Sequence, residues 1–261
     1  MSYPIFPDKH QLPAMLSADQ MIEFRRSQGG LAGLSAPQSV VLCLYKGVMK
    51  RFPWRYPSQH VGGFLGDLYL LKRGPGRVGV LGNFGIGAPA LTNMAEEMIA
   101  WGAKRLVILS LAGGLQPGLQ PGSIVAGDRA LRDEGTSYHY LPPARDVAAS
   151  SSLAKALCDA LQRRGMSPQV GATWSTDAPY RETRQEAEQY QREGVLAVDM
   201  ESAGLFAAAQ VRGVEAASVF VIGDSLAGPR WSAPPDMRLL HTRLKLALDV
   251  LISTLQTMPQ T

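Results

Sequence analysis

Cysteine is scarce in this sequence of 261 residues, and the two that are present, Cys43 and Cys158, each lie in an apolar or helical context. Two cysteines do not make the disulfide framework of a small secreted protein, and they lack the spacing of a metal site. His60, His139 and His241 also have no metal-ligand spacing with any partner. We therefore expect buried, reduced thiols in a cytoplasmic protein that holds no metal.

Long apolar runs are absent as well, and none reaches the length of a transmembrane helix. The first eleven residues carry Asp8 and Lys9 among prolines and have no apolar segment of the kind that a secretory signal needs. Lys and Arg number 26 against 22 Asp and Glu, a net charge of +4, with no basic block that would indicate nucleic acid. We expect no membrane or nucleic-acid partner, and the mild positive charge suits a small anionic substrate.

What the sequence does contain is an alternation of short apolar runs with helical patterns. Hydrophobic residues at 46% and charged residues at 18% are ordinary for a globular protein. Apolar runs predict strands at residues 39–44, 105–109, 122–126, 170–174 and 218–222. Helical spacing predicts helices at residues 90–101, 152–164, 182–193 and 236–255. This order predicts one α/β/α domain with a central, largely parallel mixed sheet.

Turn residues divide the first third of the chain. Residues 1–35 are expected to form an arm and one helix, because Pro4, Pro7 and Pro13 interrupt the start and Ser17 caps a helical pattern. The α/β domain then spans residues 36–261. Residues 52–63, rich in Pro, Trp and Tyr, are expected to be a loop outside the core of a monomer, and residues 68–72 and 77–81 to form a hairpin.

Two acids lie where a solvated surface acid is not expected. Glu201 opens an Ala-rich helical segment directly after an apolar run, and Asp224 ends another apolar run at a glycine. A carboxylate at the carboxyl end of a buried strand points into the crevice where α/β sheets bind ligands. Taken singly, Glu201 also fits a helix N-terminal acid and Asp224 a turn residue.

The sequence Met-Glu-Ser-Ala-Gly at residues 200–204, with Asp224 placed 23 residues after Glu201, resembles the nucleoside phosphorylase/nucleosidase family. That family includes purine nucleoside phosphorylases, uridine phosphorylases and methylthioadenosine nucleosidases. The resemblance covers about residues 40–227, with a Gly-x-Gly-x-Pro turn at 85–89 and an Ala-Gly-Gly turn at 112–114. It implies a nucleoside-phosphorylase-like fold, a homo-oligomer (dimer, trimer or hexamer), and no cofactor, with inorganic phosphate as co-substrate.

The resemblance also implies roles for individual residues. In the family the Met-Glu pair holds the ribose and the later Asp protonates N7 of a purine, which would be the roles of Met200, Glu201 and Asp224 here. The chemistry needs this division, because the sugar becomes oxocarbenium-like while the departing base gains charge. By the same resemblance, Ile86 approaches the ribose, and His10 enters the active site of a neighbouring subunit near the ribose 5′ end. The implied base-binding residues are Asp224, Tyr180, Thr176 and Val198.

The phosphate site departs from the family pattern. Family phosphorylases have one arginine on the strand before the Ala-Gly-Gly turn, where this chain has Ile108. A second family arginine falls near Gly62 here and is missing. A family serine at the turn is replaced by Leu111. The remaining phosphate candidates are Lys46, Lys50, Arg51 and Gly85. A basic loop fits an anion better than a general base, although a solvated charge run after a strand explains the same residues.

We expect a nucleoside phosphorylase that converts a purine nucleoside and phosphate into free base and pentose 1-phosphate. The preference for purine rests on Asp224 and on the absence of the Gln-x-Arg pair that pyrimidine-specific relatives carry. A nucleosidase that hydrolyses the same bond and a uridine phosphorylase remain open. A non-catalytic nucleoside-binding protein is a further alternative, favoured by the altered phosphate residues and disfavoured by the two retained acids.

Overall fold

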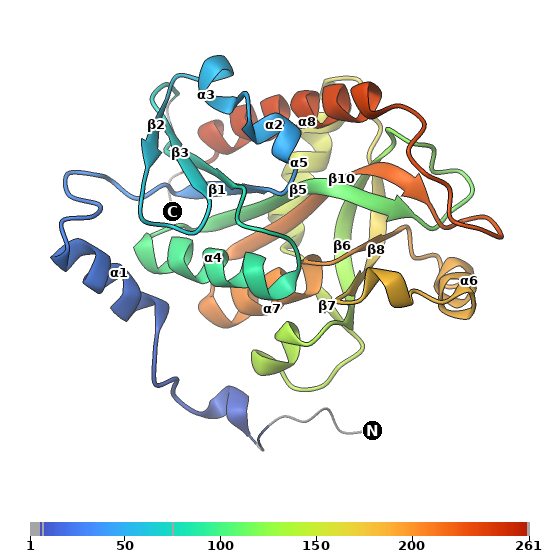
Figure 1. The fold of residues 1–261 in the computed structure, drawn as a ribbon, viewed down its shortest axis with the longest axis horizontal. Helices are drawn as coiled ribbons and strands as arrows, with labels where there is room; N and C mark the ends of the chain where they lie inside the picture. Colours follow the sequence, from blue (N-terminus) through green and yellow to red (C-terminus); the bar gives the residue numbers. More distant parts are fainter. Residues whose placement is uncertain (1–5, 7, 75, 260–261) are drawn as a thin grey trace.

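The structure is a computed structural model, and it describes residue 6, residues 8–74 and residues 76–259 (Figure 1). Pro4 and Pro7, expected to interrupt the N-terminal arm, lie outside these residues. So do Pro75, which falls in the turn of the expected hairpin, and residues 260–261 at the end of the expected domain.

Strands and helices alternate along most of the chain. The strands are β1 (Ser39–Cys43), β2 (Ser58–Val61), β3 (Asp67–Leu71), β4 (Val78–Gly82), β5 (Arg105–Gly114), β6 (Ile124–Asp133), β7 (Asp146–Ala148), β8 (Gln169–Thr176), β9 (Ala197–Asp199) and β10 (Glu215–Ser225). The helices are α1 (Ala18–Ser27), α2 (Lys46–Met49), α3 (Phe52–Arg55), α4 (Ala88–Trp101), α5 (Ser151–Arg163), α6 (Arg184–Arg192), α7 (Ser202–Arg212) and α8 (Met237–Thr257). Three short 3-10 helices are η1 (Lys9–Gln11), η2 (Thr136–His139) and η3 (Pro179–Arg181).

The strands form one ten-stranded mixed sheet in the order β10-β6-β8-β9-β5-β1-β4-β3-β2, with β7 beside β6. Because β10 also pairs with β5, five strands close into a ring, in the order β10, β6, β8, β9 and β5. The strands β1, β4, β3 and β2 extend from that ring at β5. Neighbours β4, β1, β5 and β10 run parallel, whereas β2–β3, β3–β4 and β6–β10 are antiparallel. The prediction of one α/β domain with a mixed sheet is confirmed, and so is the hairpin of β3 and β4.

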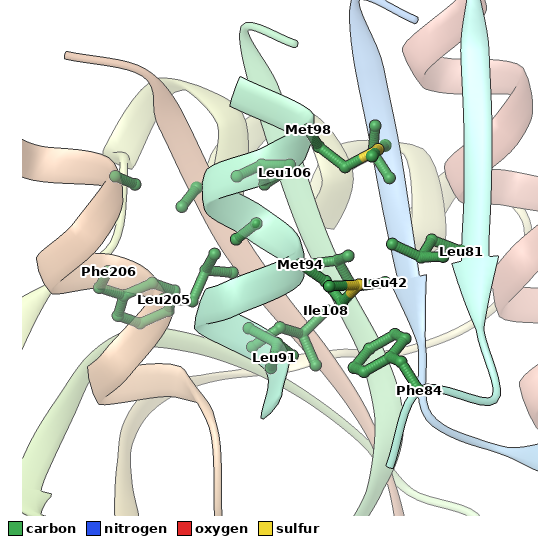
Figure 2. Packing of buried hydrophobic residues seen from close by; sticks show 14 of the residues in the cluster. Leu42, Leu81, Phe84, Leu91, Met94, Met98, Leu106, Ile108, Leu205 and Phe206 are labelled. Atoms are coloured by element: carbon green, nitrogen blue, oxygen red, sulfur yellow. The ribbon is translucent and has the colours of Figure 1, made fainter. Parts of the chain in front are cut away.

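Helices cover both faces of the sheet. In Figure 1, α4 and α7 lie on one face, and α8 and α5 lie on the other. Figure 2 shows the first layer, in which side chains of α4 and α7 pack together with side chains of the strands beneath them. The labelled residues there are Leu42, Leu81, Phe84, Leu91, Met94, Met98, Leu106, Ile108, Leu205 and Phe206. The helical spacing that predicted α4 therefore marks its buried side.

Gly204 lets α7 approach α4 closely. A Cβ at this position would lie 2.9 Å from the Cβ of Ala88 and 2.9 Å from Oγ1 of Thr92, both on α4. Real Cβ atoms do not tolerate such contacts without movement of a neighbour, so a glycine is required for this spacing. The contact brings the start of α7 beside the turn that precedes α4.

The expected loop at residues 52–63 contains regular structure, so this prediction is wrong. It includes α3, with a proline in its first turn, and β2, which pairs with β3. Phe52 is buried and stacks on Tyr56 at 4.7 Å, while Phe64 is buried against Trp101. Phe52 and Phe64 therefore belong to the core of one chain. Ring contacts between aromatic side chains stabilise α3 and β2, whose short sequences give only a weak preference for a helix or strand.

The strands β5, β6, β8 and β10 are longer than the apolar runs that predicted them. β5 continues through the glycines at 113 and 114, because β10 and β9 pair with its two edges there. β6 continues to Asp133 alongside β8. The Ala-Gly-Gly turn expected at residues 112–114 is therefore the end of strand β5, which is part of the ring of strands.

The N-terminal helix and the thiols agree with the sequence. Ser17 and Gln20 form a capping box at the start of α1, and Arg25 pairs with Glu97 of α4 at 2.8 Å. Cys43 and Cys158 are buried free thiols. The domain boundary near residue 35 stays a prediction. No helix in the described part of the chain combines the length and apolarity needed to cross a membrane.

Candidate active site

Glu201 lies at the junction of β9 and α7 and is 4% exposed. Its Oε1 accepts a hydrogen bond of 2.7 Å from the backbone N–H of Gly87. Gly85 and Gly87 have φ values of 105° and 93°, which a residue with a side chain rarely adopts. The Gly-x-Gly turn predicted from the sequence therefore aims a backbone donor at this carboxylate.

Asp199 and Ser175 fix the first turn of α7. Oδ1 of Asp199 accepts from the backbone N–H groups of Glu201 and Ser202, each at 2.7 Å, and from the Ser175 hydroxyl at 2.9 Å. The Ser175 hydroxyl oxygen accepts from the N–H of Ala203 at 3.0 Å. Sequence reasoning missed both residues, although an Asp before a helix is the usual sign of such a cap.

Burial raises the pKa of Glu201 to about 7, and the charge of Asp199 adds to the rise. The N–H groups of Gly87 and Met200 oppose it by donating to the carboxylate. Glu201 therefore titrates in the neutral range. Hydroxyl groups that donate to it would favour its charged form.

Asp224 lies at the carboxyl end of β10. The register between β10 and β5 shifts between Ile222 and Asp224, so Asp224 directly follows a bulge. Such a bulge turns the following side chain relative to its strand. Oδ2 of Asp224 accepts a hydrogen bond from the indole N–H of Trp231. Burial and the charge of Asp224 raise the pKa of Glu182 to about 7. Sequence reasoning missed Trp231 and Glu182, which lie in loops without a motif.

Gly113 lies between the two strands that lead to Glu201 and Asp224. On β5 it is in register with Val198 of β9 on one edge and with Asp224 of β10 on the other. A Cβ on Gly113 would lie 2.9 Å from Cγ1 of Val198 and 2.6 Å from Cδ1 of Leu226. The Ala-Gly-Gly sequence therefore permits the close approach of the segments that carry Glu201 and Asp224, as expected for strand-end glycines.

The other predicted ribose and base residues occupy several environments. Met200 is half-buried beside Glu201, and Ile86 is exposed in the turn before Gly87. Val198 and Thr176 are buried at the ends of β9 and β8, and the hydroxyl oxygen of Thr176 accepts from the N–H of Ala178. Tyr180 is fully exposed on η3, so nothing yet fixes its ring against a base.

His10 lines a groove of about 1130 Å³ on the α4–α7 face of the molecule. The same groove is lined by Pro89, next to the Gly-x-Gly turn, and by Asp177, whose charge contributes to the raised pKa of Glu201. In this single chain His10 therefore lies on the side of the molecule that carries Glu201.

The phosphate candidates are less closely gathered. Lys46, Lys50 and Arg51 are exposed on or just after α2, and Arg51 faces a cavity beside α8. Gly85 is in the turn before Gly87. At the family's arginine and serine positions, Ile108 is buried against α4 and Leu111 is partly buried on the opposite face (Figure 2 labels Ile108). The described residues hold no cluster of three His, Cys, Asp or Glu that could bind a metal.

A mixed α/β domain with a buried and a half-buried carboxylate at the carboxyl ends of two strands that both pair with the end of β5 is an architecture of small-molecule-binding α/β proteins. A family model described as the Phosphorylase superfamily matches residues 59–247. The chain belongs to this superfamily, and the resemblance drawn from residues 200–204 and Asp224 is confirmed.

Relatives within the superfamily carry two substrate names. Over 182 residues the chain is 31% identical to a DeoD-type purine nucleoside phosphorylase of Caldanaerobacter subterraneus subsp. tengcongensis, covering 67% of this chain and 76% of that protein. Over 188 residues it is 26% identical to a uridine phosphorylase of Haemophilus influenzae, covering 67% and 73%. The solved uridine phosphorylase of Vibrio fischeri ES114 shares the fold, with a TM-score of 0.75 at 22% identity over 85% of this chain and 93% of that one.

Proposed function

We propose that the protein cleaves the N-glycosidic bond of a purine nucleoside with inorganic phosphate, giving free base and pentose 1-phosphate. The observation that carries the proposal is the placement of Glu201 and Asp224 around the end of β5, with Gly113 between the segments that bear them. Membership of the phosphorylase superfamily and the similarity to a purine nucleoside phosphorylase support this reaction.

Glu201 and Met200 act on the sugar in this proposal. The buried Glu201 carboxylate accepts hydrogen bonds from ribose hydroxyls, which favour its charged form. As the bond to the base breaks, the sugar gains positive charge, and an anion in a site with little water stabilises it strongly. The Gly87 donor and the Asp199 cap hold Glu201 in place before the substrate arrives.

Asp224 acts on the base. A purine leaves with negative charge in its imidazole ring, so a proton delivered to N7 relieves that charge. The bulge beside Gly223 and the hydrogen bond from Trp231 orient the Asp224 side chain at the end of β10. Uracil instead leaves as an anion stabilised at its carbonyl oxygens, for which Arg or Gln donors are better suited than a carboxylate.

Phosphate is the proposed acceptor, with Lys46, Lys50 and Arg51 after β1 and the Gly85 turn as the groups that attract it. Hydrolysis is a second candidate, favoured by a specific observation. Ile108 and Leu111 place apolar side chains at positions where family phosphorylases have phosphate ligands, and Ile108 faces the core.

A time course with inosine, adenosine and uridine, run with and without inorganic phosphate and analysed by chromatography, tests the proposal. We expect base release from the purine nucleosides to require phosphate and to produce pentose 1-phosphate in equal amount. Equal base release without a sugar phosphate would establish hydrolysis. Faster cleavage of uridine would establish a uridine phosphorylase, and binding without turnover a nucleoside-binding protein.

A further inference from the structure

A separate cavity of about 280 Å³ lies between α3 and α8. Its walls come from α2, α3 and α8, which pack on the face of the sheet opposite to α4 and α7 (Figure 1). Glu201 precedes α7 and belongs to that other face. This cavity, called here the α3–α8 pocket, is therefore not the cleft of Glu201 and Asp224.

The α3–α8 pocket is strongly basic. Arg51, Arg55, His241 and Lys245 line it, and no acid does. Arg55 is neutralised by Asp249, with which it forms an ion pair. Arg51 and Lys245, by contrast, form no ion pair with any other residue that the structure describes. Two unpaired cations beside a histidine leave a positive potential that an anion would neutralise.

The positive potential of the pocket affects the pKa of His241. Burial lowers its pKa, and the charges of Lys245 and Arg51 lower it further. The ring of Tyr45 lies 5.9 Å from the ring of His241. A bound anion would reverse the two charge effects and favour protonated His241 as an additional donor.

Aromatic rings form the rest of the pocket. Phe52 is buried and stacks on Tyr56, which forms a rigid wall. Trp54 also lines the pocket, yet it is 92% exposed. A large exposed indole beside unpaired cations offers a planar ligand a stacking surface next to its anion site.

We propose that the α3–α8 pocket binds a small monophosphate that carries a planar ring, the chemical class of a nucleoside monophosphate. Arg51, Lys245 and His241 bind the phosphate, and Trp54 stacks on the ring. The volume of about 280 Å³ lies just below the usual range for small-molecule sites, about 300–1000 Å³, so it favours one ring with one phosphate over a dinucleotide. Arg51 is also among the groups proposed to attract the phosphate co-substrate, whereas Lys245, His241 and Trp54 belong to this pocket alone.

The test measures binding of adenosine 5′-monophosphate to the full chain by isothermal titration calorimetry. Lys245→Gln removes one charge and should weaken binding about tenfold, the usual effect of a hydrogen bond to a charged group. Trp54→Ala should weaken it at least about fivefold by removing the stacking surface. Lys155→Gln is the matched control, because Lys155 lies exposed on α5 of the same face and does not line the pocket. It should leave the dissociation constant unchanged.

Two further ligands separate the parts of the proposal. Inorganic phosphate lacks the ring and adenosine lacks the charge, so each should bind the pocket more weakly than the monophosphate. Turnover of nucleosides should be retained in Lys245→Gln and Trp54→Ala. Phosphate or adenosine bound at the proposed active site should bind Lys245→Gln and Trp54→Ala as tightly as wild type. The proposal is overturned if either variant binds the monophosphate as the wild type does, if the phosphate or adenosine binding that these variants lose is as tight as that of the monophosphate, or if both variants lose turnover together with binding.

Discussion

Glu201 is a carboxyl group whose charge depends on what binds beside it. Its side chain is buried, two backbone N–H groups donate to it, and Asp199 lies close enough to oppose its ionisation. Because the effects that oppose ionisation outweigh the two donors and raise its pKa to about 7, the proton on Glu201 links the stability of the fold to the binding of the sugar.

Replacing Glu201 by Gln should lower kcat/KM by about 10²-fold or more while the fold survives. The amide keeps the shape of the side chain but removes the charge that opposes the oxocarbenium-like sugar. Steady-state kinetics on inosine provides the measurement. Glu188→Gln, a change of the same type on the exposed face of α6, is the control and should have wild-type activity. Retention of more than half of the wild-type kcat/KM would rule out the role given to Glu201.

The raised pKa of Glu201 predicts a pH dependence of stability. From its ordinary value of 4.5 up to about 7, the folded protein binds more protons at Glu201 than the unfolded chain does. The stability contributed by this group is therefore present below pH 4.5 and is lost as the pH rises through 7. Urea unfolding should show wild type losing up to about 3 kcal/mol relative to Glu201→Gln across this range.

Glu182→Gln is the control for that measurement, because the pKa of Glu182 is also raised to about 7. The variant should still show the loss that Glu201 causes. A constant difference in stability between wild type and Glu201→Gln from pH 4.5 to 7.5 would contradict the assignment of the raised pKa to Glu201.

Asp224→Asn should reduce cleavage of inosine and adenosine by about 10²-fold, as expected when one general acid is removed. A substrate whose base needs no protonation, such as 7-methylguanosine, should be cleaved by the variant nearly as well as by wild type. Parallel assays of the two kinds of substrate provide the measurement. Equal impairment on both would show that Asp224 does not act as the acid.

At the scale of elements, periodic segments were predictable and short ones were not. The spacing of Leu91, Met94 and Met98 predicted α4, and the apolar run of β1 predicted a central strand. α3, β2 and β9 escaped prediction because each has only three or four residues and depends on partners distant in the sequence. The motif at residues 200–204 indicated Glu201, and the local cap by Asp199 has a sequence sign that was missed. The bond between Ser175 and Asp199 follows from tertiary packing, and the Trp231 contact depends on the geometry of a loop.

The contact of α4 with α7 predicts a cost for a very small change. Gly204→Ala places a Cβ 2.9 Å from two atoms of α4, and this overpacking should exceed the gain of about 1 kcal/mol that Ala brings to a helix. We expect a net loss of about 1–2 kcal/mol in urea unfolding and a higher KM, because displacing α4 moves the Gly87 donor. Gly118→Ala, where the new Cβ meets nothing within 4 Å, should be neutral. Equal stability of the two variants would refute this explanation.

At the scale of the molecule, we predict a homo-oligomer whose sites include the arm of a neighbour. Leu12, Met15 and Leu16 are exposed along the groove that His10 lines, and a chain rarely leaves such a run of apolar side chains in water. Light scattering should give a mass of at least two chains. Met15→Glu should reduce that mass, and Lys50→Glu, a charge reversal away from the groove, should not. A fully active monomer would refute the prediction.

The ring of strands also determines the order in which the fold can be completed during synthesis. β10 pairs with both β5 and β6, although about 80 residues separate its start from the end of β6. Until β10 has left the ribosome, β5 and β6 each present an unpaired edge, and the strand that will bear Asp224 is missing. A nascent chain that stalls before residue 215 is therefore exposed to edge-to-edge aggregation, and closure of the ring coincides with completion of the candidate active site.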